Sequence, residues 1–226
     1  MLVQIPNVLT AGEVTTLRTR IDAASWVDGS TAPAQPAVQM RDHEHLPEDA
    51  LAAREAGETV HQALARSALF VSVALPARLF PPLFSRVRPG MNARNSVGSA
   101  LRSHAPTGLR IRADLAGTLF LSDPTQYEGG ELMVDDTYGA HSVKFAAGDV
   151  VLCPGSSLHR VAAVTRGTRV AALFWVQSLV RDDARRTLLF DLDMAVLRLT
   201  RDNLQAPDVS NLTGVYHNLL RMWAEP

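Results

Sequence analysis

The stretch that decides the fold covers residues 145–178 and reads FAAGDVVLCPGSSLHRVAAVTRGTRVAALFWVQS. It holds three short apolar runs, divided by a Pro-Gly-Ser-Ser loop and by a Thr-Arg-Gly turn. His159 opens the second run, and Arg169 opens the third run ten residues later. Apolar, β-branched runs divided by turns at this spacing are typical of an antiparallel sandwich or barrel.

The same pattern continues upstream to about residue 70, through the runs LFVSVAL, LFSRV, GTLFLS and GELMV. Before it, LVQIP predicts a strand, and Thr10 with Glu13 three residues later predicts a helix that begins with a capping box. Residues 27–50 are rich in Pro, Gly, Ser and charge, which predicts a surface loop or flap. Residues 51–68 are Ala-rich and predict a second helix.

Beyond Leu179 the sequence becomes helical again. The predicted class is therefore α+β: a double-stranded β-helix (jelly roll) core with N-terminal and C-terminal helices. We expect three regions: an N-terminal helical and flap region at 1–78, the jelly-roll domain at 79–178, and a C-terminal helical extension at 179–226.

Composition excludes several classes of protein. The 226 residues include 22 Lys and Arg and 23 Asp and Glu, a net charge of -1, which argues against nucleic acid or an anionic membrane as a partner. No apolar run is long enough to span a bilayer, and the first residues lack the pattern of a signal peptide. Cys153 is the single cysteine, so an internal disulfide is excluded. A cytoplasmic protein is expected.

His159 and Arg169 carry the clearest chemistry. In a double-stranded β-helix, their offset lets the imidazole and the guanidinium face one cavity from neighbouring strands. Imidazole is a good ligand for ferrous iron, and a guanidinium binds a carboxylate through two parallel hydrogen bonds. The simpler interpretation is a histidine at a strand end and a solvated arginine.

The chain resembles the PKHD-type hydroxylases, relatives of prolyl 4-hydroxylase among the Fe(II)/2-oxoglutarate dioxygenases. The resemblance runs almost end to end, through LPARLFPPLFSR, RIRADLAGTLFLSDPTQYEGGEL, DTYGAHSVKFAAGDVVLCPGSSLHR and LTGVYHNLLRMWAE. It implies a jelly-roll fold with flanking helices, and Fe(II) and 2-oxoglutarate as cofactors. It also implies that His159 matches the distal metal-ligand histidine and that Arg169 matches the arginine that binds the distal carboxylate of 2-oxoglutarate.

One segment departs from the family. There, a His-x-Asp pair on the strand before RIRADL supplies the other two iron ligands. Here the segment reads RPGMNARNSVGSALRSHAPTG, and the register from its two ends places Ser96 at the His position and Gly98 at the Asp position. Asn92 stands where a family His often lies, and Val87 stands where a Tyr often helps to hold 2-oxoglutarate. Serine is a weak neutral ligand and glycine has no side chain, so we expect that His159 alone does not hold Fe(II) tightly.

Loss of the Asp alone would resemble the related halogenases, but that reading needs the first His, which is absent. Other residues are candidates for substitute ligands. Asp42, His43, Glu44 and His45 lie in the predicted flap, where two histidines at i and i+2 either clamp a metal or are simply solvated.

The remaining candidates have structural interpretations. His104 is predicted in a solvent-facing turn, His61 on an exposed helix face, and Cys153 as a small buried hydrophobe. Asp114 is expected to be either structural or substrate-facing. Together with Asn92 and Asn95, Asp114 is a candidate for lining a new pocket.

Two functions remain open from the sequence. The first is an oxygenase-like protein with a degenerate triad, either a non-catalytic homologue or the partner subunit of an active oxygenase. The alternative is an active oxygenase that oxidises a small molecule with substitute or partner-supplied ligands. The C-terminal region carries an apolar stripe at helical spacing, which comprises Leu212, Val215, Leu219, Leu220 and Trp223. This stripe either caps the sandwich or joins two chains. The second case gives a homo-oligomer, or a hetero-oligomer with an active paralogue.

Overall fold

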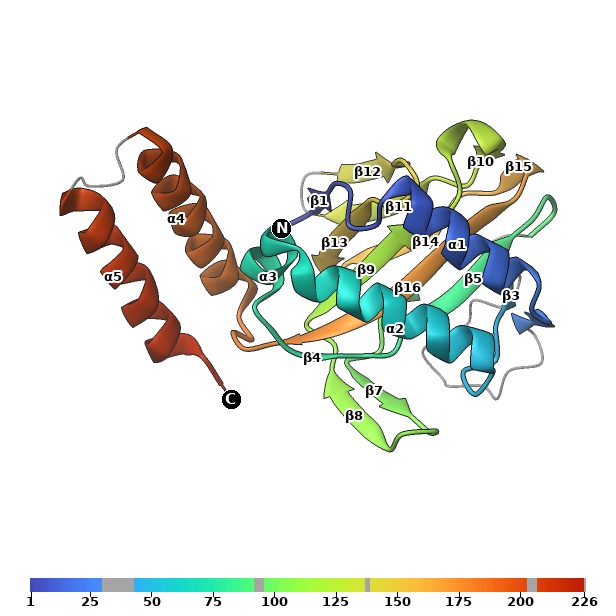
Figure 1. Ribbon diagram of the computed structural model, residues 1–226, viewed down its shortest axis with the longest axis horizontal. Helices are drawn as coiled ribbons and strands as arrows, with labels where there is room; N and C mark the ends of the chain where they lie inside the picture. Colours follow the sequence, from blue (N-terminus) through green and yellow to red (C-terminus); the bar gives the residue numbers. More distant parts are fainter. Residues whose placement is uncertain (30–42, 92–95, 137–138, 203–206, 226) are drawn as a thin grey trace.

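Two antiparallel sheets packed on each other form the centre of the molecule (Figure 1). This computed structural model describes residues 1–29, 43–91, 96–136, 139–202 and 207–225. The strands of the larger sheet are β1 (Val3–Ile5), β2 (Val27–Asp28), β3 (Glu44–His45), β4 (Pro76–Leu79), β5 (Leu83–Val87), β9 (Leu115–Phe120), β13 (Val150–Pro154) and β16 (Arg169–Ser178). Those of the smaller sheet are β6 (Ser96–Val97), β11 (Leu132–Asp136), β12 (Gly139–Val143) and β14 (Leu158–Val161).

The order of the larger sheet is β1-β13-β9-β16-β5-β3-β2, with β4 also paired with β16, and the order of the smaller sheet is β12-β11-β14-β6. Two further hairpins extend the core: β7 (Leu101–His104) with β8 (Leu109–Arg112), and β10 (Tyr127–Gly129) with β15 (Val164–Gly167). A short 3₁₀ helix (Pro124–Gln126) precedes β10. The strands predicted within residues 145–178 are all present.

Apolar side chains fill the space between the two sheets. Phe120 of β9 and Val151 of β13 belong to one buried cluster with Val134 of β11 and Val161 of β14. Burial of such side chains is the dominant force that holds sheet on sheet, at roughly 25 cal/mol per Å² of apolar surface. Because β14 lies between β11 and β6 in this layer, its register on β6 fixes the surroundings of His159.

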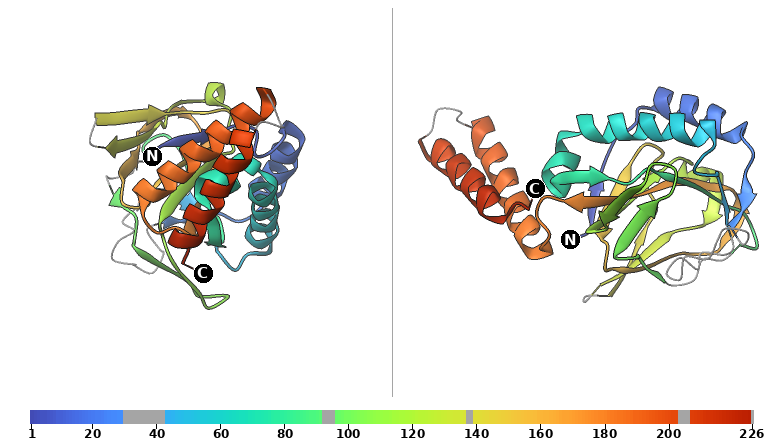
Figure 2. Two further views of the ribbon diagram at one scale, coloured as in Figure 1. Left: turned by 90° about the vertical axis from the view of Figure 1, so that its left-hand side faces the viewer. Right: turned by 90° about the horizontal axis from the view of Figure 1, so that it is seen from below.

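Three helices cover the outer face of the larger sheet (Figure 2). They are α1 (Ala11–Asp22), α2 (Leu51–Arg66) and α3 (Ala68–Ala74). The predicted capping box of α1 is confirmed, because the Thr10 hydroxyl accepts from the Glu13 backbone N–H at 3.3 Å and the Glu13 carboxylate accepts from the Thr10 backbone N–H at 2.8 Å. The buried faces of these helices share one core with the larger sheet.

Two predictions for the first 78 residues are wrong. The run LFVSVAL, predicted as a strand, forms α3, because Ser67 caps it and Phe70, Val73 and Ala74 meet the core at helical spacing. The predicted flap at 27–50 is not all loop, since its two ends form β2 and β3 and join the larger sheet beside β5. Residues 30–42 lie outside the described residues. The division at residues 78 and 178 stays a prediction.

The C-terminal region is a hairpin of two helices, α4 (Asp183–Asp202) and α5 (Pro207–Trp223). It lies at one end of the core, with α4 next to α3, as the right-hand view of Figure 2 shows. Leu189 of α4 packs with Leu75 and Val180 of the core, and Leu220 and Trp223 of α5 pack against them. Among the described helices, none combines the length and apolar character needed to cross a bilayer.

Substitution of Gly117 by Ala is expected to destabilise the fold by about 3 kcal/mol through overpacking. A Cβ at this position in β9 would lie 2.2 Å from the Phe174 ring, and Phe174 is fully buried with an edge contact to Phe70. Chemical denaturation measures the change, with Gly12→Ala as the control, because Gly12 has open space around its Cα. Equal free energies of unfolding for the two variants would contradict the prediction.

Candidate functional site

His159 lies in the middle of the smaller sheet. It is opposite Val134 of β11 on one side and opposite Ser96 of β6 on the other. Its Nδ1 atom is 3.0 Å from the Ser157 carbonyl oxygen. A carbonyl only accepts, so Nδ1 carries the hydrogen, and the tautomer with this hydrogen has its lone pair at Nε2. Nε2 is therefore the atom available to a metal or a proton.

Position 96 pairs with His159, and Gly98 follows two residues later along the same segment; the assignment of these positions to the family ligands stays a prediction. The backbone of β6 pairs with β14, with Ser96 opposite His159 and Val97 opposite Leu158. At Gly98 a Cβ would lie 3.1 Å from the Gly155 carbonyl oxygen and 3.7 Å from the Trp175 indole nitrogen. Among the described residues, no three His, Cys, Asp or Glu side chains are grouped so that they could hold a metal ion.

Arg169 is a buried cation with no ion-pair partner among the described residues. It begins β16 opposite Val87 of β5, and its side chain is 1% exposed. Its Nε and Nη2 atoms have no hydrogen-bond partner among the described residues, and its guanidinium lies 5.6 Å from the centre of the Phe120 ring. Burial lowers its pKa. An unpaired buried charge costs several kcal/mol, so this site is suited to an anion that enters with a ligand.

Tyr127 is the second polar group beside Arg169. It begins β10, is buried, and its hydroxyl has no hydrogen-bond partner within the described part of the chain. Burial raises the Tyr127 pKa, and the positive charge of Arg169 opposes that shift. The hydroxyl therefore stays protonated and can donate to an anion. Tyr127 was not predicted from the sequence, where the only position considered for a tyrosine that holds 2-oxoglutarate was Val87.

Arg169 and Tyr127 together form the Arg169 cradle. The other predicted pocket residues do not belong to it. The Asp114 carboxylate accepts from the Arg112 side chain at 2.6 and 3.0 Å and from the Ser178 backbone N–H at 2.9 Å. These contacts tie β8 to the end of β16, so the structural role is favoured over a role in a pocket. Asn92 and Asn95 lie outside the described residues.

Two histidine predictions are wrong. His104 is buried, because its ring packs edge-on against Phe80 at 5.7 Å and its Nδ1 contacts the Thr107 hydroxyl at 2.7 Å. His61 is half-buried, with Nε2 3.3 Å from the Phe80 carbonyl oxygen. Both imidazoles are held in place by the small cluster around Phe80, which the turn and helix patterns did not predict.

The flap histidines and Cys153 contribute no described metal site. The rings of His43 and His45 are 6.3 Å apart, and burial lowers the pKa of His45. Asp42 lies outside the described residues. Cys153 is buried as predicted, and burial raises the pKa of its thiol to about 11, so it is a poor nucleophile at neutral pH.

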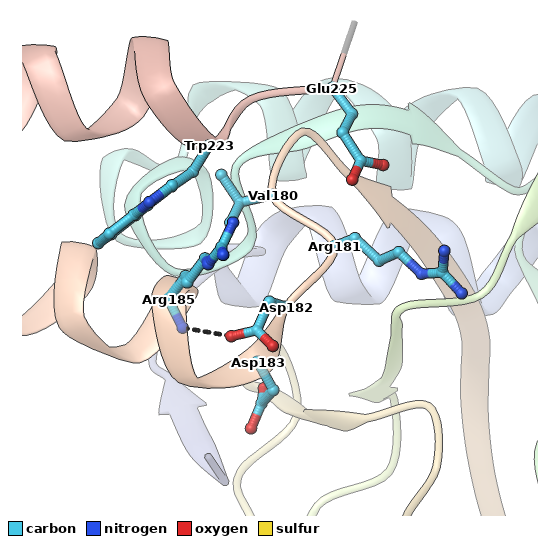
Figure 3. A pocket seen from close by; sticks show the side chains of 7 residues that line it. All are labelled: Val180, Arg181, Asp182, Asp183, Arg185, Trp223 and Glu225. Carbon is cyan, nitrogen blue, oxygen red and sulfur yellow. Dashed lines mark hydrogen bonds between the residues drawn. The ribbon is translucent and has the colours of Figure 1, made fainter.

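A separate pocket of about 380 Å³ opens where the hairpin meets the core (Figure 3). Arg181, Arg185 and Trp223 line it, together with acidic residues that already have partners. Asp182 accepts from the Arg185 backbone N–H at 2.8 Å, and Asp183 accepts from Arg186 at 2.8 Å. Neither His159 nor Arg169 belongs to this pocket, so volume does not identify the candidate site here.

Two family models match the chain. Residues 91–177 match the 2OG-Fe(II) oxygenase superfamily, and residues 183–225 match the PKHD-type hydroxylase C-terminal domain. A PKHD-type hydroxylase from Xanthomonas campestris pv. campestris (strain B100) is 51% identical over 227 residues, which cover 100% of both chains. The second matched region coincides with the α4–α5 hairpin.

Solved structures show the same fold at low identity. A prolyl-4-hydroxylase from Pseudomonas putida is 21% identical, with 78% of this chain and 92% of that chain covered and a TM-score of 0.50. HygX from Streptomyces hygroscopicus, with nickel and 2-oxoglutarate bound, is 17% identical, with 76% and 81% covered and a TM-score of 0.53. The predicted α+β jelly roll is thus confirmed. With full-length identity of about half, the chain belongs to the PKHD-type hydroxylase family of the 2OG-Fe(II) oxygenase superfamily.

Proposed function

We propose that this member of the family binds 2-oxoglutarate but does not assemble an iron triad from its own residues. It then acts as a non-catalytic homologue or as the partner subunit of an active oxygenase. The observation that carries the proposal is the composition of the segment paired with His159: Ser96 lies opposite His159, and Gly98, two residues later, has no side chain.

The Arg169 cradle fits the distal carboxylate of 2-oxoglutarate. Two guanidinium nitrogens and one phenol hydroxyl are buried there without hydrogen-bond partners among the described residues. A carboxylate could accept from all three donors, and charge-assisted hydrogen bonds of this kind are the strong ones. HygX, which shares the fold, holds 2-oxoglutarate together with nickel. The Arg169 cradle can therefore bind 2-oxoglutarate without a metal ion at His159.

The residues around His159 do not fit a resident ferrous ion. A facial triad needs two imidazoles and one carboxylate, and His159 supplies one imidazole. Gly98 offers no ligand atom, and serine is a neutral, weak donor at position 96. Asp114, the carboxylate considered as a substitute, is held by Arg112 and Ser178.

An active oxygenase with ligands from a partner chain is the second candidate. The retained Nε2 lone pair of His159 and the unpartnered Arg169 favour it, because both would be needed. This candidate predicts succinate release that begins only when a triad-complete relative or another partner is added. The first candidate predicts no release from this chain under any such mixture beyond that of the relative alone.

Anaerobic calorimetry on the purified chain tests the proposal. Titration with 2-oxoglutarate is expected to give one site per chain, and titration with Fe(II) is expected to give no tight, stoichiometric binding. Metal analysis of protein isolated without chelators provides an independent measurement. Tight binding of one Fe(II) per chain would overturn the proposal, whatever the activity.

A further inference from the structure

Helix α4 presents an apolar stripe that faces away from the core. Leu188, Leu192, Ala195 and Leu199 follow each other at spacings of four, three and four residues. This is the a/d spacing of a heptad repeat, which places the four side chains along one face of the helix. Leu188 is 58% exposed and Leu199 is 44% exposed, so the ends of the stripe are uncovered.

Helix α5 carries a matching stripe. Leu212, Val215, Leu219 and Met222 follow at spacings of three, four and three residues. Val215 is 47% exposed, and Met222 is 74% exposed. A hairpin that only capped the core would bury one face of each helix. Here the apolar surface of each helix extends beyond that face, and on α5 it continues from Leu219, which packs against the core cluster, to the exposed Val215 and Met222.

The two stripes lie on the same side of the hairpin. Leu189 of α4 packs in one cluster with Tyr216 and Leu220 of α5, and each of these residues follows a stripe residue by one position. One position turns the helix by about 100° in the same sense in both helices. Because the helices are antiparallel and face each other, equal turns point both stripes to one side. Figure 2 shows α4 and α5 side by side as one layer in front of the core.

The charges beside the α4 stripe are self-complementary. Asp191 and Arg198 are exposed and stand one position before Leu192 and Leu199, so both lie on the flank of α4 that faces away from α5. Neither side chain has an ion-pair partner among the side chains that the structure describes. They are seven residues apart with opposite sign, close to symmetric about the middle of the stripe. When α4 packs antiparallel on a copy of itself, each Asp191 therefore meets an Arg198.

We propose that the outer face of the α4–α5 hairpin is a homodimer interface, in which two hairpins form a four-helix bundle. The two-fold axis lies between the two hairpin layers, parallel to them and at right angles to the helices, so that α4 packs antiparallel on α4 and α5 packs antiparallel on α5. Contiguous exposed apolar surface of this kind marks an association site. The charge pattern favours a second copy of this chain as the partner, because a two-fold axis places Asp191 of one α4 beside Arg198 of the other α4.

Light scattering after gel filtration tests the proposal on the full chain. The wild-type protein is expected at twice the chain mass of 24.5 kDa. Leu199→Lys is expected to weaken the dimer by at least about a hundredfold, because the two-fold axis places two charges in the apolar interface. Leu197→Lys is the matched control: Leu197 has nearly the same exposure, 46%, but points to another side of α4, so its dimer should persist.

A charge exchange tests the antiparallel register. Asp191→Arg should weaken the dimer by roughly tenfold, because two attractive pairs become two repulsive ones. Adding Arg198→Asp to that variant should restore the affinity to within about threefold.

Three results would overturn the proposal. The first is a wild-type chain that is monomeric at high micromolar concentration. The second is a dimer that Leu199→Lys and Leu197→Lys affect equally. The third is a chain that associates only with a triad-complete relative and never with itself. Circular dichroism confirms that each variant is folded.

Discussion

A chain that carries both Ser96→His and Gly98→Asp is expected to bind Fe(II) more than a hundredfold more tightly than the wild-type chain. Loss of a group that merely orients a metal ligand costs about 10–100-fold in affinity, so two missing ligands cost more. The double variant completes a set of two imidazoles and one carboxylate with His159. Backbone pairing already places position 96 opposite His159, so the scaffold for the set is present.

The site at position 98 can accept an aspartate. Gly98 does not have the left-handed backbone that only glycine tolerates well. A Cβ there would be 3.1 Å from the Gly155 carbonyl oxygen, which asks for a shift of a few tenths of an ångström. The Trp175 indole N–H, 3.7 Å from that Cβ, has no partner among the described residues and can donate to the new carboxylate.

Calorimetry under anaerobic conditions measures the gain, with Ni(II) as a second metal that does not oxidise. Ser96→Ala with Gly98→Ala is the matched control and should bind no better than the wild-type chain. Adding His159→Ala to the double variant should remove most of the gain. A gain that survives this third substitution would mean that the metal sits elsewhere, and the assignment of the site would be wrong.

The sequence predicted the sheets better than the first helices. The runs between 145 and 178 alternate with turns at short intervals, which favours strands, and β13 and β16 are buried on both faces. The run LFVSVAL has the same composition, yet it forms α3 because its spacing also fits a helix and Phe70 meets Phe174 of the core. Local propensity did not decide between the two, and tertiary packing did.

The candidate site was predicted in part for a similar reason. His159 and Arg169 follow from the strand pattern and the family resemblance, because each opens a run. Tyr127 could not be found this way, since it begins the short strand β10 and reaches Arg169 only through the fold. The burial of His104 was missed because its contacts to Phe80 and Thr107 depend on the β7–β8 hairpin packing on the core.

Substitution of Arg169 by Met is expected to weaken 2-oxoglutarate binding by at least about a hundredfold. Hydrogen bonds to charged groups contribute about 1.5–3 kcal/mol each, and the cradle would lose at least two of them. Each 1.4 kcal/mol corresponds to a tenfold change in affinity. Arg166→Met is the matched control, since Arg166 lies on the neighbouring strand β15 in an exposed pair with Glu128 and should leave the affinity unchanged.

The same substitution should make the ligand-free protein more stable, by about 1–4 kcal/mol, because it replaces an unpaired buried cation with an apolar side chain of similar length. The two effects together separate a binding residue from a structural one. A structural arginine would lower the melting temperature when it is lost, whereas a cradle for an anion leaves Arg169 without a partner until the ligand arrives. Thermal unfolding with and without 2-oxoglutarate measures both effects: the wild-type protein should gain stability from the ligand, and Arg169→Met should start higher and gain none. Destabilisation of the ligand-free variant, with unchanged affinity, would show that Arg169 serves the fold and not the ligand.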